Sequence, residues 1–193
     1  MQFILQPGVS LQAGRFNAVV APEHAITQAI NRNTGLQRYL FLFVCGNYSR
    51  VLNGISGSTK TFEIRRAFTA HQMLTILKEA SHTVIFIEHD PTLYDEARTM
   101  IAPIAGTLTE ISHDLLVILY SPKPDPAFRS LIREAGRIYF LTPASDMRKL
   151  HASGNGRTTG SSPVSRKERM EKQMQLPAFL NRNTILPDSK TAR

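Results

Sequence analysis

The run TVIFIE at residues 83–88 decides the fold of this chain, because four consecutive apolar residues lead into an acid. A strand that is covered on both faces of a parallel sheet reads as a continuous apolar run rather than as an alternating one. Two further runs have the same character, YLFLFV at residues 39–44 and LLVILY at residues 115–120. The sequence therefore predicts several buried strands of one parallel sheet.

Helical patterns separate these strands. Residues 70–80, AHQMLTILKEA, place their apolar side chains on one side of a helix. Pro22 followed by Glu23 favours a helix start, because a proline and an early acid suit the first turn. Residues 126–136 read as an amphipathic helix with Gly136 as its C-terminal cap. Shorter strands are expected at residues 16–21, 62–68 and 137–142.

The alternation of strands and helices predicts an α/β domain over residues 1–150, with a mostly parallel sheet between two layers of helices. Within it, residues 91–111 are expected to be mostly helical, with breaks at Pro103 and Gly106. Residues 151–193 have a different composition, rich in Gly, Ser and Thr at the start and holding eight Lys or Arg against three Asp or Glu. We expect this segment to be a flexible basic tail.

Composition narrows the class of protein. The chain has 193 residues, a formal net charge of +8 and a single cysteine, Cys45, which has no partner for an internal disulfide. These features exclude a secreted disulfide scaffold and favour a reducing compartment, so a cytoplasmic location without a membrane partner is expected. The excess of positive charge is concentrated in residues 151–193 and has two interpretations, a solvated tail or a contact with a polyanion such as nucleic acid. The spacing of the histidines fits no zinc motif, and Cys45 is interpreted as a small buried apolar residue.

Acidic residues follow the strand at residues 83–88. Glu88 lies at the strand end, where a Walker B carboxylate would hold a magnesium-bound water. Asp90 follows two residues later, so Glu88 and Asp90 are also candidate metal ligands. Together with Asp95 they would serve a metal-dependent nuclease. An ordinary acidic strand end remains the alternative.

Residues 54–61, GISGSTKT, nearly match the phosphate loop G-x-x-x-x-G-K-S/T. Lys60 and Thr61 stand at the lysine and hydroxyl positions, which makes them candidate nucleotide-binding residues. Thr59 replaces the second glycine, and a β-branched residue resists the backbone conformations that wrap phosphates. The segment is therefore better interpreted as a flexible loop.

The chain contains three short motifs, RAFTAHQ at residues 66–72, EHDPTLY at residues 88–94 and CGNY at residues 45–48, and they resemble motifs of RecA/RadA-type recombinases. RAFTAHQ at residues 66–72 is similar to the family's R-A-F/Y-N-T-D-H-Q stretch, one residue shorter. EHDPTLY at residues 88–94 resembles D-S-x-T-A-L-F/Y after the Walker B strand, with Glu88 in the aspartate position. CGNY at residues 45–48 lies where family members carry D-x-E-G-x-F or a G-G-N-x-F turn. The resemblance covers about residues 10–142 and implies a RecA-like fold of the P-loop NTPase type.

The departures from this family concern its catalytic parts. The strand at residues 16–21 leads into Pro22 and Glu23, without a glycine loop or a lysine. The glutamate that positions the attacking water is missing from residues 45–48, and Ser121 followed by Pro122 replaces the polar phosphate sensor. The resemblance therefore implies a degenerate Walker A region and a fold that has lost, or nearly lost, ATP hydrolysis.

Two segments of the tail are candidate binding sites. The densest cationic cluster is expected to contact DNA and consists of Arg166, Lys167, Arg169 and Lys172. The next segment resembles the sliding-clamp-binding peptide Q-x-x-I/L/M-x-x-F/Y-F/Y/L, with the matching residues Gln173, Leu176, Phe179 and Leu180. An apolar segment that docks on the protein's own core is the other interpretation of these residues.

The leading hypothesis is a non-catalytic RecA-like paralogue without a cofactor. It would bind DNA, a recombinase or a sliding clamp during DNA recombination or repair. The alternatives are a divergent ATPase that uses Lys60, Thr61 and Glu88 with ATP and magnesium, the metal-dependent nuclease described above, and an interaction module unrelated to DNA. The sequence predicts no oligomeric state.

Overall fold

The computed structural model describes residues 2–56 and 61–141. Its central feature is a sheet of six strands, in which every pair of neighbours runs parallel. The strands are β3 (Asn17–Val20), β4 (Phe41–Cys45), β5 (Phe62–Arg66), β6 (Val84–Glu88), β7 (Leu116–Ser121) and β8 (Arg137–Phe140). Their order across the sheet is β5-β4-β6-β7-β3-β8, so β5 and β8 form its two edges. The predicted strands and the predicted parallel sheet are confirmed.

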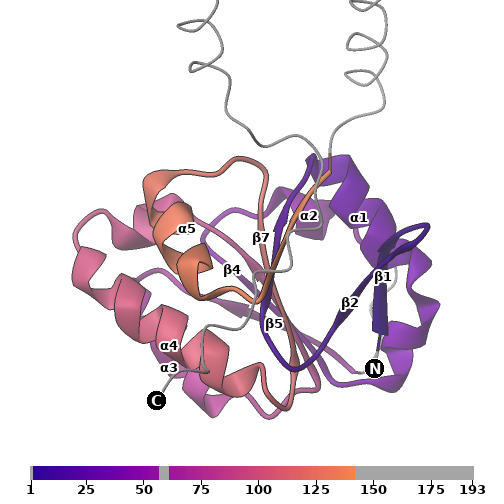
Figure 1. Ribbon diagram of the computed structural model, residues 1–193, viewed down its shortest axis with the longest axis horizontal. Coiled ribbons are helices and arrows are strands. Elements are labelled where there is room, and N and C mark those ends of the chain that lie inside the picture. Colours follow the sequence, from indigo (N-terminus) through magenta and orange to yellow (C-terminus); the bar gives the residue numbers. More distant parts are fainter. Residues whose placement is uncertain (1, 57–60, 142–193) are drawn as a thin grey trace, which may run out of the picture. The chain divides into compact units, whose positions relative to one another are not determined.

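Helices cover both faces of the sheet, as the alternating pattern predicts (Figure 1). One face carries α3, α4 and α5, and the other carries α1 and α2. The α-helices are α1 (Glu23–Arg32), α2 (Arg50–Asn53), α3 (Ala70–Glu79), α4 (Ile101–Ile111) and α5 (Pro126–Leu131). The 3₁₀ turns are η1 (Thr34–Arg38), η2 (Pro91–Tyr94), η3 (Arg98–Met100) and η4 (Ile132–Glu134). The α/β class with helices on both faces is therefore confirmed.

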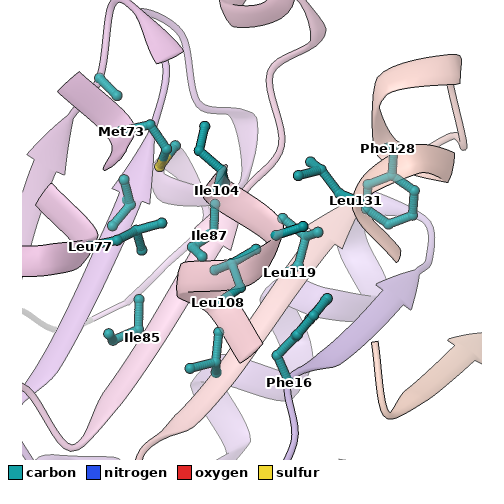
Figure 2. Close-up of a cluster of buried hydrophobic side chains, with 14 of the residues drawn as sticks. Phe16, Met73, Leu77, Ile85, Ile87, Ile104, Leu108, Leu119, Phe128 and Leu131 are labelled. Atoms are coloured by element: carbon teal, nitrogen blue, oxygen red, sulfur yellow. The ribbon is translucent and has the colours of Figure 1, made fainter. Parts of the chain in front are cut away.

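The pleat of the central strands divides their side chains between two hydrophobic cores. In β6, Ile85 and Ile87 pack under α3, α4 and α5, whereas Val84 and Phe86 face α1, α2 and the N-terminal strands. All four are at most 2% exposed, which explains why this strand reads as one apolar run. Figure 2 shows the first core, where side chains from β6, β7 and three helices interdigitate.

A β-hairpin at the N-terminus extends the second core, and the sequence analysis did not predict it. Its strands are β1 (Gln2–Gln6) and β2 (Val9–Gln12), which pair antiparallel. Gly8 has a φ of 80°, which a glycine adopts without strain, and it follows Pro7 in the turn. Phe3 and Leu11 pair across the hairpin and are fully buried. The Pro-Gly dipeptide between two short alternating segments was the available signal.

The expected breaks at Pro103 and Gly106 are wrong, because α4 runs through both residues. Pro103 is the third residue of the helix. The first turn of a helix has no internal acceptors for its N–H groups, so the missing proton of proline costs nothing there. The 3₁₀ turns η2 and η3 occupy the first part of the segment instead.

The expected glycine cap at Gly136 is also wrong. Helix α5 and the turn η4 end before it, and the glycines with positive φ in the described residues are Gly8 and Gly14. A glycine is required at this position for a different reason. A Cβ on Gly136 would lie closer to the side chain of Arg15 than van der Waals contact allows. The N–H of Gly136 donates to the carbonyl oxygen of Phe16 at 3.1 Å, which brings the two chain segments together.

No helix within residues 2–56 and 61–141 is long and apolar enough to cross a membrane. The expected domain boundary near residue 150 and the basic tail lie outside the described residues.

Candidate functional site

The carboxyl ends of the parallel strands meet at one edge of the sheet, which we call the carboxyl edge. Ligands of open α/β sheets bind in this position. The strand-end residues there are Val20, Cys45, Arg66, Glu88, Ser121 and Phe140. Backbone hydrogen bonds continue the ladder beyond the strands, for example from Ala67 N to Cys45 O at 2.9 Å and from His89 N to Tyr120 O at 2.8 Å.

Glu88, the Walker B-like candidate, is bound to the protein's own backbone. The hydroxyl of Ser49 donates to Glu88 Oε2, and the N–H groups of Arg50 and Val51 also hydrogen-bond this carboxylate. Ser49 Oγ accepts in turn from Leu52 N at 2.9 Å, which caps the first turn of α2. Glu88 therefore anchors α2 to the end of β6.

Burial raises the pKa of Glu88 above its ordinary value, against the hydrogen bonds from Ser49, Arg50 and Val51, which favour the ionised form. The carboxylate of Glu23, at the start of α1, raises the pKa of Glu88 further. A second negative charge therefore acts on Glu88 from the position where a phosphate-binding helix would begin.

The connection from β3 to α1 consists of two residues, Ala21 and Pro22. A phosphate loop wraps its ligand with a longer glycine-rich segment, so this connection is too short for one. The hydroxyl of Tyr120 donates to the carbonyl oxygen of Ala21 at 3.2 Å, and Tyr120 is 1% exposed. Burial raises the pKa of Tyr120, with smaller contributions from Glu88 and Glu23. A buried, neutral phenol is thus hydrogen-bonded to this connection.

Asp90 is held by the turn that follows it. Its Oδ1 accepts from Thr92 N at 3.0 Å and from Thr92 Oγ1 at 2.7 Å. Gly46 lies against its other carboxylate oxygen, because a Cβ on Gly46 would overlap the side chain of Asp90. Asp95 follows η2 and is exposed. Within the described residues, no group of three or more His, Cys, Asp or Glu side chains is placed to hold a metal ion.

The thiol of Cys45 is fully buried at the end of β4. Burial raises its pKa, while Arg66 lowers it and the carboxylates of Glu88 and Asp90 raise it. A buried thiol with a raised pKa is a poor nucleophile. The interpretation of Cys45 as a small buried apolar residue is confirmed.

A buried histidine, His89, and a half-buried aspartate, Asp125, form a pair that no sequence pattern indicated. His89 Nε2 lies 2.6 Å from Asp125 Oδ2, and the side chain of His89 is 1% exposed. The imidazole stacks on Tyr94 and meets the edge of Phe128. Asp125 Oδ1 accepts from the N–H groups of Ala127 at 2.8 Å and Phe128 at 3.0 Å, so Asp125 also caps α5.

The surroundings of His89 and Asp125 determine the protonation state of each side chain. Burial lowers the pKa of His89, against the nearby carboxylates of Asp125 and Asp90, so the imidazole is neutral. Burial raises the pKa of Asp125, but the N–H of Phe128 and the contact with His89 outweigh that effect and lower it overall. Because an ionised carboxylate only accepts, Nε2 of His89 carries the proton. Its Nδ1 is buried and has no hydrogen-bond partner.

Thr61 lies at the amino-terminal ends of the strands, whereas Glu88 lies at their carboxyl ends. The carbonyl oxygen of Thr61 accepts from Phe41 N at 2.8 Å, and Phe41 pairs with Phe62 at the starts of β4 and β5. The hydroxyl of Thr61 donates to the carbonyl oxygen of Gln37 at 3.2 Å. A five-residue strand, roughly 13 Å long, separates the two ends. The structure therefore does not bring Thr61 and Glu88 together, and Lys60 lies outside the described residues.

The predicted tail sites also lie outside the described residues. They are the cationic cluster of Arg166, Lys167, Arg169 and Lys172 and the clamp-type peptide of Gln173, Leu176, Phe179 and Leu180.

The sequence matches no protein-family model. It is 36% identical over 134 residues to a protein of the archaeon Archaeoglobus fulgidus, and the match covers 69% of this chain and 67% of that protein. The chain belongs to the same family as this archaeal protein. The relative is described as an uncharacterized protein, so membership of this family assigns no activity.

Proposed function

We propose that the protein is a RecA-like paralogue that does not hydrolyse ATP and acts as a DNA-binding or recombinase-binding accessory factor in DNA recombination or repair. The placement of three motifs supports the RecA-like part of this proposal. The recombinase-like segments at residues 45–48, 66–72 and 88–94 begin at the ends of β4, β5 and β6. These strands are neighbours in the sheet, so segments that are distant in sequence share one half of the carboxyl edge.

One observation carries the non-catalytic part of the proposal, and it is the binding of Glu88 to Ser49 and to the backbone of α2. A Walker B carboxylate has to face a magnesium-bound water. Here the carboxylate is occupied by protein donors. Two further features disfavour phosphate binding. The two-residue connection after β3 is too short to wrap phosphates, and the nearby carboxylate of Glu23 repels them.

The two enzyme hypotheses receive less support from the geometry. A divergent ATPase requires Thr61 and Glu88 in one site, and the strands separate them. A nuclease requires Glu88, Asp90 and Asp95 to share a metal, whereas Glu88 binds α2 and Asp90 binds Thr92. Both carboxylates have structural partners.

The basic tail supports the DNA-binding part of the proposal. An excess of five positive charges on 43 residues releases condensed counterions when it meets a phosphate backbone. The clamp-type peptide beside the cationic cluster adds a sliding clamp as a proposed protein partner.

We expect the full chain to bind DNA with a steep dependence on salt. Each phosphate that is neutralised contributes about −0.9 to the slope of log affinity against log salt for a duplex, and about −0.7 for a single strand. Replacing Arg166, Lys167, Arg169 and Lys172 by glutamine should flatten the slope by about two to four units. Fluorescence anisotropy with labelled oligonucleotides between low and moderate potassium chloride measures this slope. A truncation before Ser153 is the control for the whole tail.

No binding of the full chain to single-stranded or duplex DNA, even at low salt, would contradict the DNA-binding part of the proposal. Binding with a slope that is identical in the glutamine variant would assign the contact to residues 1–150 instead of to the tail.

A further inference from the structure

Two aromatic side chains beside the carboxyl edge are exposed to solvent. Tyr48 is 87% exposed and Phe68 is 59% exposed. Tyr48 lies in the turn after β4, and Phe68 lies in the turn after β5. Aromatic side chains contribute most when they are buried, so their exposure in adjacent turns indicates a surface for a partner.

The two turns are tied together close to these aromatic residues. β4 and β5 are paired up to Cys45 and Arg66, and the ladder continues with the bond from Ala67 N to Cys45 O. Arg66 Nη1 donates to the carbonyl oxygens of Gly46 at 3.2 Å and Asn47 at 2.7 Å. The residues immediately before Tyr48 and Phe68 are thus held in place, so the two rings are presented on fixed turns.

The charged residues of the turns after β4 and β5 are all basic. Residues 46–50 and 66–72 contain two arginines and one histidine but no aspartate or glutamate. Arg50, Arg66 and His71 are all exposed. The segment after β6 is acidic by comparison and carries three acids, which are Asp90, Asp95 and Glu96. The exposed residues of these two turns are therefore aromatic and cationic, while the carboxylates of Glu88 and Asp90 lie beneath them against Ser49 and Gly46.

We propose that the turns after β4 and β5 form a binding platform for single-stranded nucleic acid. Bases stack on Tyr48 and Phe68, and Arg50 and Arg66 contact the phosphates. Exposed aromatic rings beside arginines are the chemistry with which proteins bind single strands without reading sequence. A duplex fits this platform less well, because its base faces are stacked on one another. The inference rests on the proposed function, since it assigns the DNA contact to a site in the folded domain.

The test measures the affinity of the full chain for a fluorescently labelled oligothymidylate of about 20 nucleotides at low salt. Tyr48→Ala and Phe68→Ala are each expected to weaken binding about tenfold, since one stacked base contributes ~1–3 kcal/mol. Tyr48→Phe keeps the ring and should bind as the original chain does. Phe140→Ala is the matched control, because Phe140 is 54% exposed at the end of β8, the outer strand on the opposite side of the sheet from β5.

Each outcome decides between the inference and the function on which it rests. If the original chain binds no nucleic acid, the DNA-binding function fails and the platform fails with it. If the chain binds but Tyr48→Ala and Phe68→Ala bind equally well, the platform is overturned and the DNA-binding function stands. Unchanged DNA affinity with loss of recombinase binding in the same two variants would overturn the platform in favour of a protein-binding surface.

Discussion

Asp125→Ala is expected to lower the free energy of unfolding by about 3 kcal/mol. The substitution removes the cap of α5, where Asp125 accepts from the N–H groups of Ala127 and Phe128, and such a cap contributes ~1 kcal/mol. It also removes the hydrogen-bond partner of His89 Nε2. A buried donor left without an acceptor costs about 1–3 kcal/mol more.

Urea unfolding at pH 7.5 measures this effect, with Asp125→Asn as the matched variant. The asparagine carbonyl can cap α5, but its amide group does not accept from His89, so we expect an intermediate loss of stability. A loss below about 0.5 kcal/mol for Asp125→Ala would be typical of an ordinary surface substitution and would contradict the structural role of the pair.

The same pair makes stability depend on pH. Burial lowers the pKa of His89 in the folded chain, so below pH 6.5 the unfolded chain takes up a proton that the folded chain resists. Stability is therefore lost as the pH falls below 6.5 toward the lowered pKa. The pKa of Asp125 is also lowered, so its contribution disappears at still lower pH, below 3.8. His89→Gln should flatten the first of these two losses.

Glu88→Ala is expected to lower the free energy of unfolding by about 2 kcal/mol, whereas Glu88→Gln should change it by less than about 1 kcal/mol. The alanine variant leaves the Ser49 hydroxyl and the N–H groups of Arg50 and Val51 without their acceptor. Glutamine keeps one acceptor oxygen and carries no charge. Because burial raises the pKa of Glu88, the folded chain already disfavours the ionised form that glutamine removes.

Thermal or urea unfolding of the two variants and of Ser49→Ala measures these differences. The raised pKa also sets the sign of the pH effect, because the contribution of Glu88 to stability grows as the pH falls through its folded pKa toward 4.5. Glu88→Gln should lack this gain. Equal stability of Glu88→Ala and the original chain, with loss of a divalent-metal-dependent activity in both variants, would instead identify Glu88 as a metal ligand.

The strands that are buried on both faces of the sheet were predictable from the sequence. β4, β6 and β7 are covered on both faces, so nearly every residue is apolar and the pattern has one interpretation. The N-terminal hairpin was missed because its strands are covered on one face only, so their sequence is not a continuous apolar run. The outward side chains of Gln2 and Ile4 are exposed. Pro103 was misleading because sequence alone does not show whether a proline lies in the first turn of a helix or in its interior.

The candidate site was predictable only in part. Glu88 was found because it ends a strand, but its hydrogen bonds to Ser49 and α2 come from a segment 39 residues earlier in the chain. The contact between His89 and Asp125 spans 36 residues and depends on the neighbouring positions of β6 and β7 in the sheet. Thr61 lies at the amino-terminal ends of the strands because it directly precedes β5, which runs parallel to β4. The loop motif itself does not specify the direction of the strand that follows it.

The central proposal is that the carboxyl edge has no working ATP site, and a thermal shift with ATP tests this proposal most directly. A site with micromolar affinity would stabilise the folded chain by about 4 kcal/mol at ~1 mM ATP. For a domain of this size such a gain raises the melting temperature by about 10 °C. We predict a shift below about 1 °C, with or without magnesium. A shift of several degrees that disappears in Lys60→Ala would contradict the account and support the ATPase hypothesis.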